Sequence, residues 1–139
     1  FQGKQDFMAK NVHIGNTAQH QASGAVKYYI IKGLFVKPRY TFFGRNYANF
    51  DLRGLNGAGA NKDSWMIPDY GLFDAMAGYE FNYQGLKFNL NVNVNNVLNT
   101  VYINDAQNNN SSQQDYDANS AAVFFGPGRT YVVGLKVTF

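Results

Sequence analysis

The sequence predicts an all-β fold of about five antiparallel strands, and three observations lead to this prediction. Apolar and polar residues alternate in several segments, most regularly over residues 86–96, LKFNLNVNVNN. The 3.6-residue periodicity of helices is essentially absent. Very short loops containing glycine join the segments in pairs. Because alternate side chains of a strand point to opposite sides, each segment is expected to have one apolar and one polar face.

We expect strands over residues 22–30, 34–46, 70–83, 86–98 and 129–139. The faces can be assigned from apolar residues alone, so the charged residues test the assignment independently. Those inside the segments all fall on the less apolar face: Lys27, Lys37, Arg39, Arg45, Asp74, Glu80, Lys87 and Lys136. Only Asp69 and Arg129, at segment ends, break the parity, so the alternation is expected to reflect real strand faces.

The connections are unequal in length. A three-residue loop, Ile31 to Gly33, is expected to pair Ile30 with Leu34, with Gly33 in the left-handed conformation. Gln84 and Gly85 are expected to form a two-residue hairpin loop. Long polar segments at 1–20, 47–69 and 99–127 are expected to be loops at the other end of the sheet. Soluble domains seldom contain so many long loops without structure.

Composition excludes several classes of protein. The chain has 139 residues, suited to one domain, and no cysteine, so it has no disulfide or thiolate metal site. Its net charge of +3 is small and scattered, which argues against a nucleic-acid partner. No apolar run approaches the ~20 residues of a transmembrane helix. Because the sequence starts at Phe1 without an initiator methionine, we expect a piece of a longer protein.

The apolar face could point into a soluble core or outward to lipid. Predicted strands of about 10–14 residues exceed the ~5–6 usual in soluble sheets and suit a tilted membrane-spanning strand of ~9–11. Aromatic residues gather near strand ends, as in the interfacial belts of membrane proteins. Asparagine is depleted in ordinary strands, so the row Asn89 to Asn95 suits a hydrated or protein-filled lumen. We therefore expect a segment of an antiparallel transmembrane β-barrel, with a soluble β-sandwich as the alternative.

Three stretches carry a resemblance to a known family: IPDYGLFDAMAGYEF (67–81), LKFNLNVNVNNVLNTVYI (86–103) and FFGPGRTYVVGLKVTF (124–139). In this order they resemble the late barrel strands of TonB-dependent outer-membrane receptors, in particular the SusC-like nutrient importers. The resemblance implies the C-terminal part of a barrel of about 22 strands that encloses an N-terminal plug. The plug and the remaining strands are expected to lie outside this chain.

The resemblance also implies partners and sides. Energy would come from TonB, a SusD-like surface lipoprotein would cover the barrel, and the cargo would be an oligosaccharide or a peptide. The location would be the outer membrane of a Gram-negative type of cell. The tight turns would be periplasmic and the long loops extracellular, and Phe139 would belong to the signal read by the barrel-insertion machinery. A passive porin and a soluble glycan-binding sandwich are the alternative functions.

Candidate site residues fall into three groups. We expect the inward-facing cations to contact acidic groups of the plug, with Glu80 as a local partner, or else to line a hydrated lumen: Lys27, Lys37, Arg39, Lys87 and Lys136. Residues of the long loops could bind a ligand by ring stacking and planar hydrogen bonding: Tyr47, Phe50, Arg53, Asp63, Trp65, Tyr102 and Asp105. Asp115, Asp117 and Asn119 resemble the start of a calcium loop, but Ser120 stands where the turn glycine belongs.

Other patterns carry no chemistry. His13 and His20 lack metal-ligand spacing, and NGAGA (56–60) lacks the context of a phosphate loop. No nucleophile triad or carboxylate pair is evident, so we expect neither an enzyme nor a cofactor.

Overall fold

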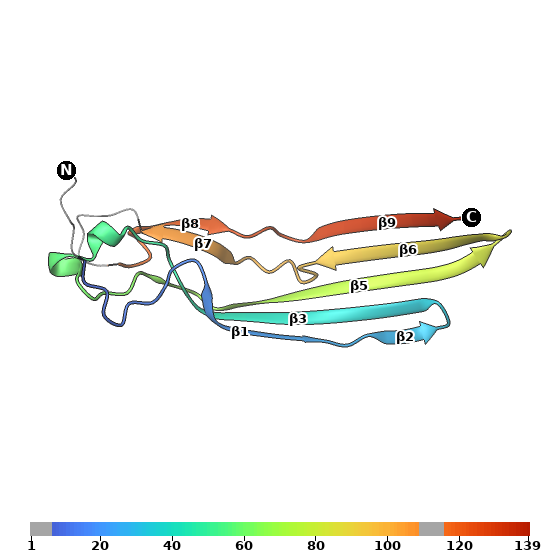
Figure 1. Cartoon of the computed structure of the whole chain (residues 1–139), viewed down its shortest axis with the longest axis horizontal. Coiled ribbons are helices and arrows are strands. Elements are labelled where there is room, and N and C mark those ends of the chain that lie inside the picture. The colour runs from blue at the N-terminus through green and yellow to red at the C-terminus, as the bar shows by residue number, and fades with distance from the viewer. Residues whose placement is uncertain (1–6, 109–115) are drawn as a thin grey trace. The chain divides into compact units, whose positions relative to one another are not determined.

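The computed structural model describes residues 7–108 and 116–139, and within them the chain adopts an all-β fold with antiparallel sheets (Figure 1). The chain divides into two compact units. We call residues 21–42, 70–101 and 127–139 the sheet unit. The described residues among 1–20, 43–69 and 102–126 are called the loop unit.

Within the described residues, the strands form a seven-stranded sheet and a separate two-stranded sheet. The main path of the larger sheet is β1-β3-β5-β6-β9, and β2 and β4 each pair with β3. The smaller sheet joins β7 to β8. The strands are β1 (Ala18–Ala25), β2 (Tyr28–Ile31), β3 (Leu34–Tyr47), β4 (Met66–Ile67), β5 (Tyr70–Tyr83), β6 (Leu86–Asn95), β7 (Ile103–Asn108), β8 (Ala121–Phe125) and β9 (Thr130–Thr138).

The register of the sheet unit places apolar residues opposite apolar residues. Tyr79 on β5 pairs with Leu90 on β6, which pairs with Leu135 on β9. One residue along, Glu80 pairs with Asn89, which pairs with Lys136. The sheet therefore has one apolar and one polar face, because cross-strand partners lie on the same side of a sheet.

Both tight turns contain residues in the left-handed conformation, which the sequence predicts for Gly33, and the second turn has the predicted length of two residues. Gln84 and Gly85 have φ angles of 49° and 81°, and they connect the pair Tyr83–Leu86. Gly33 has φ 87°. The first hairpin differs in register, because Ile31 rather than Ile30 pairs with Leu34, and an irregularity lies between Tyr29 and Ile31.

The predicted strand over 22–30 is divided into β1 and β2 at Val26 and Lys27. The backbone N–H of Val26 donates to the carbonyl oxygen of Pro38 on β3 at 3.2 Å. Proline has no N–H to complete the reciprocal bond of the ladder. The break between β1 and β2 therefore lies opposite Pro38, where β3 has no backbone N–H to donate.

Strand β6 ends at Asn95, three residues before the predicted end at residue 98, because the chain turns at Asn96. Asn96 has φ 51°, and its side-chain oxygen accepts the Thr100 N–H at 2.8 Å. Its side-chain amide donates to the carbonyl oxygens of Thr100 and Pro127. Asparagine is among the few residues that tolerate this backbone region and bond to their own turn.

The segments expected to be structureless loops contain regular structure, which corrects that expectation. Residues 47–69 hold two 3-10 turns, Leu52–Gly54 and Gly57–Gly59, and strand β4, and residues 99–127 hold the β7–β8 hairpin. Ala48, Ile67 and Ala106 form a small core, against which Trp65, Ile103 and Ala121 pack. These segments can order because they share a core that no local pattern reveals.

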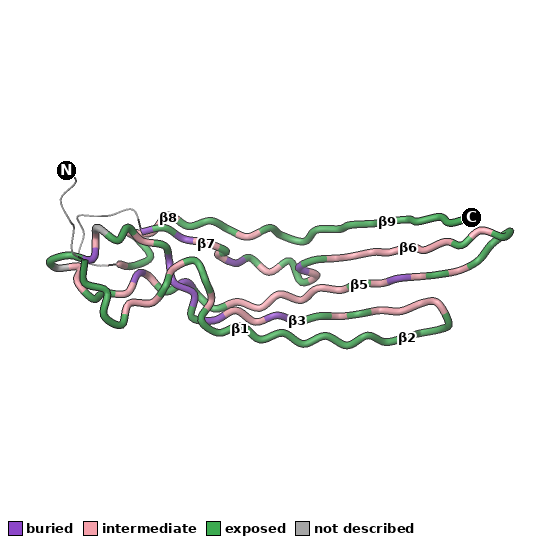
Figure 2. Tube along the Cα trace, in the orientation of Figure 1, coloured by how far each residue is buried: buried purple, intermediate pink, exposed green. Residues whose placement is uncertain are grey.

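Buried apolar residues are confined to the loop unit. In the described chain they are Tyr47, Ala48, Leu55, Ile67, Tyr102 and Ala106. Figure 2 displays the strands of the sheet unit as mostly exposed or intermediate. The sheet unit therefore has no buried apolar core built from the described residues.

The Phe35 ring lies over Gly78 on the polar face, where a Cβ at position 78 would collide with it. We expect Gly78→Ala to lower the free energy of unfolding by about 1–3 kcal/mol, the usual cost of overpacking. Gly134→Ala is the matched control, because Gly134 pairs with the same Asn91 and a Cβ there meets no atom within 4 Å. Urea unfolding followed by circular dichroism measures both, and equal effects would contradict the packing role of Phe35.

Candidate functional site

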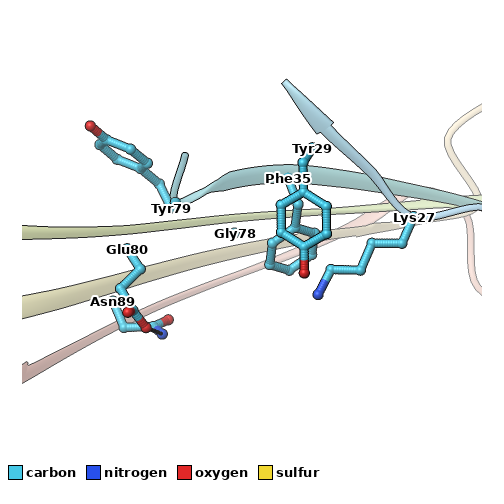
Figure 3. A pocket seen from close by; sticks show the side chains of 8 residues that line it. Lys27, Tyr29, Phe35, Gly78, Tyr79, Glu80 and Asn89 are labelled. Carbon is cyan, nitrogen blue, oxygen red and sulfur yellow. Dashed lines mark hydrogen bonds between the residues drawn. The ribbon is translucent and has the colours of Figure 1, made fainter. Parts of the chain in front are cut away.

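The predicted cation Lys27 lies on the polar face of the sheet unit above aromatic rings. Its Nζ is 4.0 Å from the centroid of Phe35 and 4.9 Å from that of Tyr29. An open hollow of about 270 Å³ lies beside these residues, and Gly78, Glu80 and Asn89 line its other side (Figure 3). A cation held over ring faces is attracted by their electron density, so the two rings stabilise the position of the Lys27 ammonium group.

The asparagines of β6 bond along and across their strand. Asn91 donates its side-chain amide to the side-chain oxygen of Asn89 at 2.6 Å, and Asn89 donates to Glu80 at 3.4 Å. Glu80 also forms an ion pair with Lys87 at 2.8 Å. Asn89 and Asn91 are thus connected to each other and to a carboxylate, which explains how the strand accommodates these two amides.

Asp74 joins three segments of the sheet unit. Its Oδ2 accepts from Nη2 of Arg39 at 2.7 Å and from Nε at 3.2 Å, and its Oδ1 accepts the backbone N–H of Asn96 at 2.9 Å. The side chain of Asp74 is 16% exposed and that of Arg39 54% exposed. Arg39 therefore has a partner within the chain, and Lys37 lines a small hollow of about 100 Å³ beside the same pair.

The predicted ligand residues of the long loops do not form one cluster. Tyr102 is buried, and its ring lies over Gly126. Trp65 packs on the small core. Asp105 has a buried Oδ1 without a partner among the described residues. Phe50 is half-buried, and Arg53 lies in the first 3-10 turn, with its side chain outside the described part of the structure.

Tyr47 and Asp63 do come together, and they meet at His13. The His13 ring stacks on Tyr47 with centroids 4.5 Å apart and an angle of 3° between the planes. Asp63 binds His13 twice, with Oδ2 2.8 Å from Nδ1 and Oδ1 accepting the backbone N–H at 2.6 Å. Nη2 of Arg45 lies 3.4 Å from Nε2 of His13. Sequence reasoning missed His13 and Arg45 as site residues, because 50 positions separate His13 from Asp63 and no local spacing marks the pair.

The calcium-like segment is a self-bonded turn in its described part. Asp117 Oδ1 accepts the backbone N–H groups of Asn119 and Ser120, each at 2.9 Å, and the Ser120 hydroxyl accepts the backbone N–H of Asp117 at 3.0 Å. Asp115 lies outside the described residues. The described residues contain no group of three or more His, Asp or Glu side chains placed to hold a metal ion.

The remaining predicted positions lie in the sheet unit. Lys136 pairs across the ladder with Asn89, and Phe139 follows the end of β9 with its side chain fully exposed. Among the described residues, no helix has the length and apolar character needed to cross a membrane.

Searches with protein-family models, curated proteins and solved structures gave no significant match to this chain.

Asp74 should contribute more to stability than the exposed ion pair of the same face. Asp74→Ala leaves the Asn96 N–H without its acceptor, so we expect a loss of about 1–3 kcal/mol in the free energy of unfolding. Asp74→Asn retains an oxygen for that bond and should lose less. Glu80→Gln, which breaks only the exposed contact to Lys87, should change little. Urea unfolding compares the three, and equal losses for Asp74→Ala and Glu80→Gln would contradict the role of Asp74.

The Asp117 turn should weaken in acid. The backbone N–H of Ser120 lowers the pKa of Asp117 below its ordinary value, and Asn119 acts in the same direction. Because the pKa of Asp117 is lower in the folded chain, ionised Asp117 stabilises the turn at pH values above its ordinary pKa. This stabilisation is lost as the pH falls through the lowered pKa of the folded chain. A carboxyl ¹³C titration should give a lower midpoint for Asp117 in the folded protein than in urea. Ser120→Ala, which keeps the backbone donor, should preserve most of the difference; its complete loss would contradict the assignment.

Proposed function

We propose that the chain is the C-terminal barrel segment of a TonB-dependent outer-membrane importer of the SusC-like type. The observation that carries the proposal is an apolar sheet face that is exposed on β9. On β9 this face presents Tyr131, Val133 and Leu135, with Val133 and Leu135 67% and 64% exposed. The row continues across the register to Val92 and Leu90 on β6.

Such a face needs an apolar environment. Burial of apolar surface contributes roughly 25 cal/mol per Å², and a soluble sheet obtains it from a second packed layer. The buried apolar residues of the described chain all belong to the loop unit, so the sheet unit lacks that layer. Lipid would supply the apolar environment, and a membrane barrel presents its apolar residues in this alternating way.

The edges of the sheet support a larger barrel. Strands β1 and β9 end the path β1-β3-β5-β6-β9, so each lacks a neighbour on one side within the described sheet. An open edge in lipid leaves backbone groups unsatisfied at several kcal/mol each. Further strands of the same protein would pair with both edges and close the barrel.

The polar face would then line the lumen. Lys27, Lys37 and Lys136 would face the plug, with Lys27 held over the rings of Phe35 and Tyr29. Arg39 and Lys87 have Asp74 and Glu80 as ion-pair partners within the chain. In this proposal TonB supplies the energy, a SusD-like lipoprotein covers the barrel, and Phe139 takes part in membrane insertion. The cargo would be an oligosaccharide or a peptide, and the location the outer membrane of a Gram-negative type of cell.

Single cysteines on the two faces provide a direct test, because these 139 residues contain no cysteine of their own; any cysteine elsewhere in the full-length protein is first replaced by serine. Leu135→Cys and Lys136→Cys are adjacent on β9 but project to opposite faces. In membranes containing the full-length protein, we expect the thiol at 135 to resist a water-soluble maleimide and to react with a lipid-soluble one. The thiol at 136 should behave in the opposite way whenever the lumen is open to water.

Two results would reject the proposal. One is equal labelling of positions 135 and 136 by the water-soluble reagent in membranes. The other is a protein that stays monomeric and folded in plain buffer without detergent, which is the behaviour of a soluble sandwich. A barrel that conducts small solutes passively, with no plug sequence upstream, would identify a porin instead.

A further inference from the structure

His13 is held in a single orientation in the loop unit. Asp63 binds the ring at Nδ1 and the backbone N–H of the same residue, and Tyr47 supports one face of the ring. Because a carboxylate accepts hydrogen bonds, Nδ1 carries the proton that points at Asp63. The other ring nitrogen, Nε2, is therefore the atom left to interact with a further group.

Arg45 is the group that faces Nε2. Its Nη2 lies 3.4 Å from Nε2 of His13. The Arg45 backbone leaves the usual strand conformation, with φ 52°, and its N–H donates to Asp69 Oδ1 at 2.9 Å. The side chain of Arg45 is exposed, and that of His13 is 32% exposed. Both side chains are therefore at least partly open to solvent.

The charge state of His13 decides what this pair can bind. Neutral His13 offers Nε2 as an acceptor, and the Arg45 guanidinium can donate to it directly. Protonated His13 turns Nε2 into a donor, so two cationic donors then face each other without an acceptor. An oxyanion that accepts from both removes this repulsion and forms two charge-assisted hydrogen bonds.

The surrounding charges limit the anion to a weakly charged one. Asp63 accepts a hydrogen bond from the Nδ1 side of the ring, and Asp69 accepts one from the Arg45 backbone N–H. Tyr47 contributes an uncharged ring face below His13. These two carboxylates offset the positive charge of His13 and Arg45, so a single negative charge suits the site better than a dianion. The planar guanidinium fork matches a carboxylate in shape.

We propose that His13 Nε2 and the Arg45 guanidinium form a carboxylate-binding site that takes up its ligand when His13 is protonated. The ligand class is a small monocarboxylate, either a uronic acid or an acidic amino-acid side chain. The residues involved all belong to the loop unit, so the proposal stands independently of the transport function.

Calorimetric titration of the full-length protein tests this site with three probes: glucuronate, N-acetylglutamate amide and glucose. We expect the carboxylates to bind roughly tenfold or more tightly at about pH 5.5 than at about pH 8, because an imidazole that carries both protons donates from Nε2 and a neutral one does not. Glucose, which lacks a carboxylate, should show no such dependence. The probe that binds more tightly shows whether the natural ligand is a uronic acid or an acidic amino-acid side chain. Either order of affinity supports the site.

Variants distinguish specific binding by His13 and Arg45 from a general effect of positive surface charge on carboxylate affinity. Arg45→Gln should weaken glucuronate binding about tenfold at the lower pH, a typical loss for one charge-assisted hydrogen bond. Arg45→Lys should restore part of the affinity because it keeps the charge. His13→Gln should abolish the pH dependence. Lys10→Gln removes an exposed cation of the same unit and should leave binding unchanged.

The proposal is overturned if carboxylate affinity is equal at both pH values, or if Lys10→Gln weakens binding as much as Arg45→Gln. Loss of the pH dependence in His13→Gln counts only for a variant whose circular dichroism matches the parent. For that reason Arg45→Lys, which alters no packed ring, provides the second measurement. Failure of this titration would leave the cysteine-labelling result on the sheet unit unaffected.

Discussion

The paired backbone ladder is the constraint on which the sheet unit depends. Antiparallel pairing places Tyr79, Leu90 and Leu135 on one side and Glu80, Asn89 and Lys136 on the other. A shift of one residue in any strand would exchange its two faces, so the register and the chemistry of both faces are linked. Turns with left-handed residues at Gly33, Gln84 and Gly85 hold this register at one end.

The two units obtain their stability in different ways. The loop unit has a small core of Ala48, Ile67 and Ala106, against which other apolar residues of the described chain pack. The sheet unit relies on its ladder, on the bonds of Asp74 and Asn96, and on aromatic rings such as Phe35 that cover glycine. Its apolar face contributes to stability only when something else covers it. The environment is therefore part of the folding energetics of the sheet unit.

Polar side chains far apart in the sequence carry the specific contacts. Arg39 and Asp74 are 35 positions apart, and Asn96 bonds to Pro127 across 31 positions. The contacts of Asn96 lie just beyond the end of β6, where the ladder stops and backbone groups need other partners. His13, Arg45 and Asp63 have a different character, because they join one imidazole to a carboxylate at Nδ1 and to a guanidinium at Nε2 in a partly exposed position.

The sequence by itself determined the all-β class, the faces of the long strands, the turn at Gln84 and Gly85 and the position, though not the register, of the turn at Gly33. Period-two alternation and glycine-containing loops are local signals, and Leu86 to Asn95 formed a strand as its pattern predicted. The tertiary structure alone decided the division of the first strand opposite Pro38, the order within 47–69 and 99–127, and the meeting of His13 with Asp63 and Arg45. Each of these depends on a partner supplied by a distant segment. Alternation along one strand carries no information about which distant side chain lies beside it.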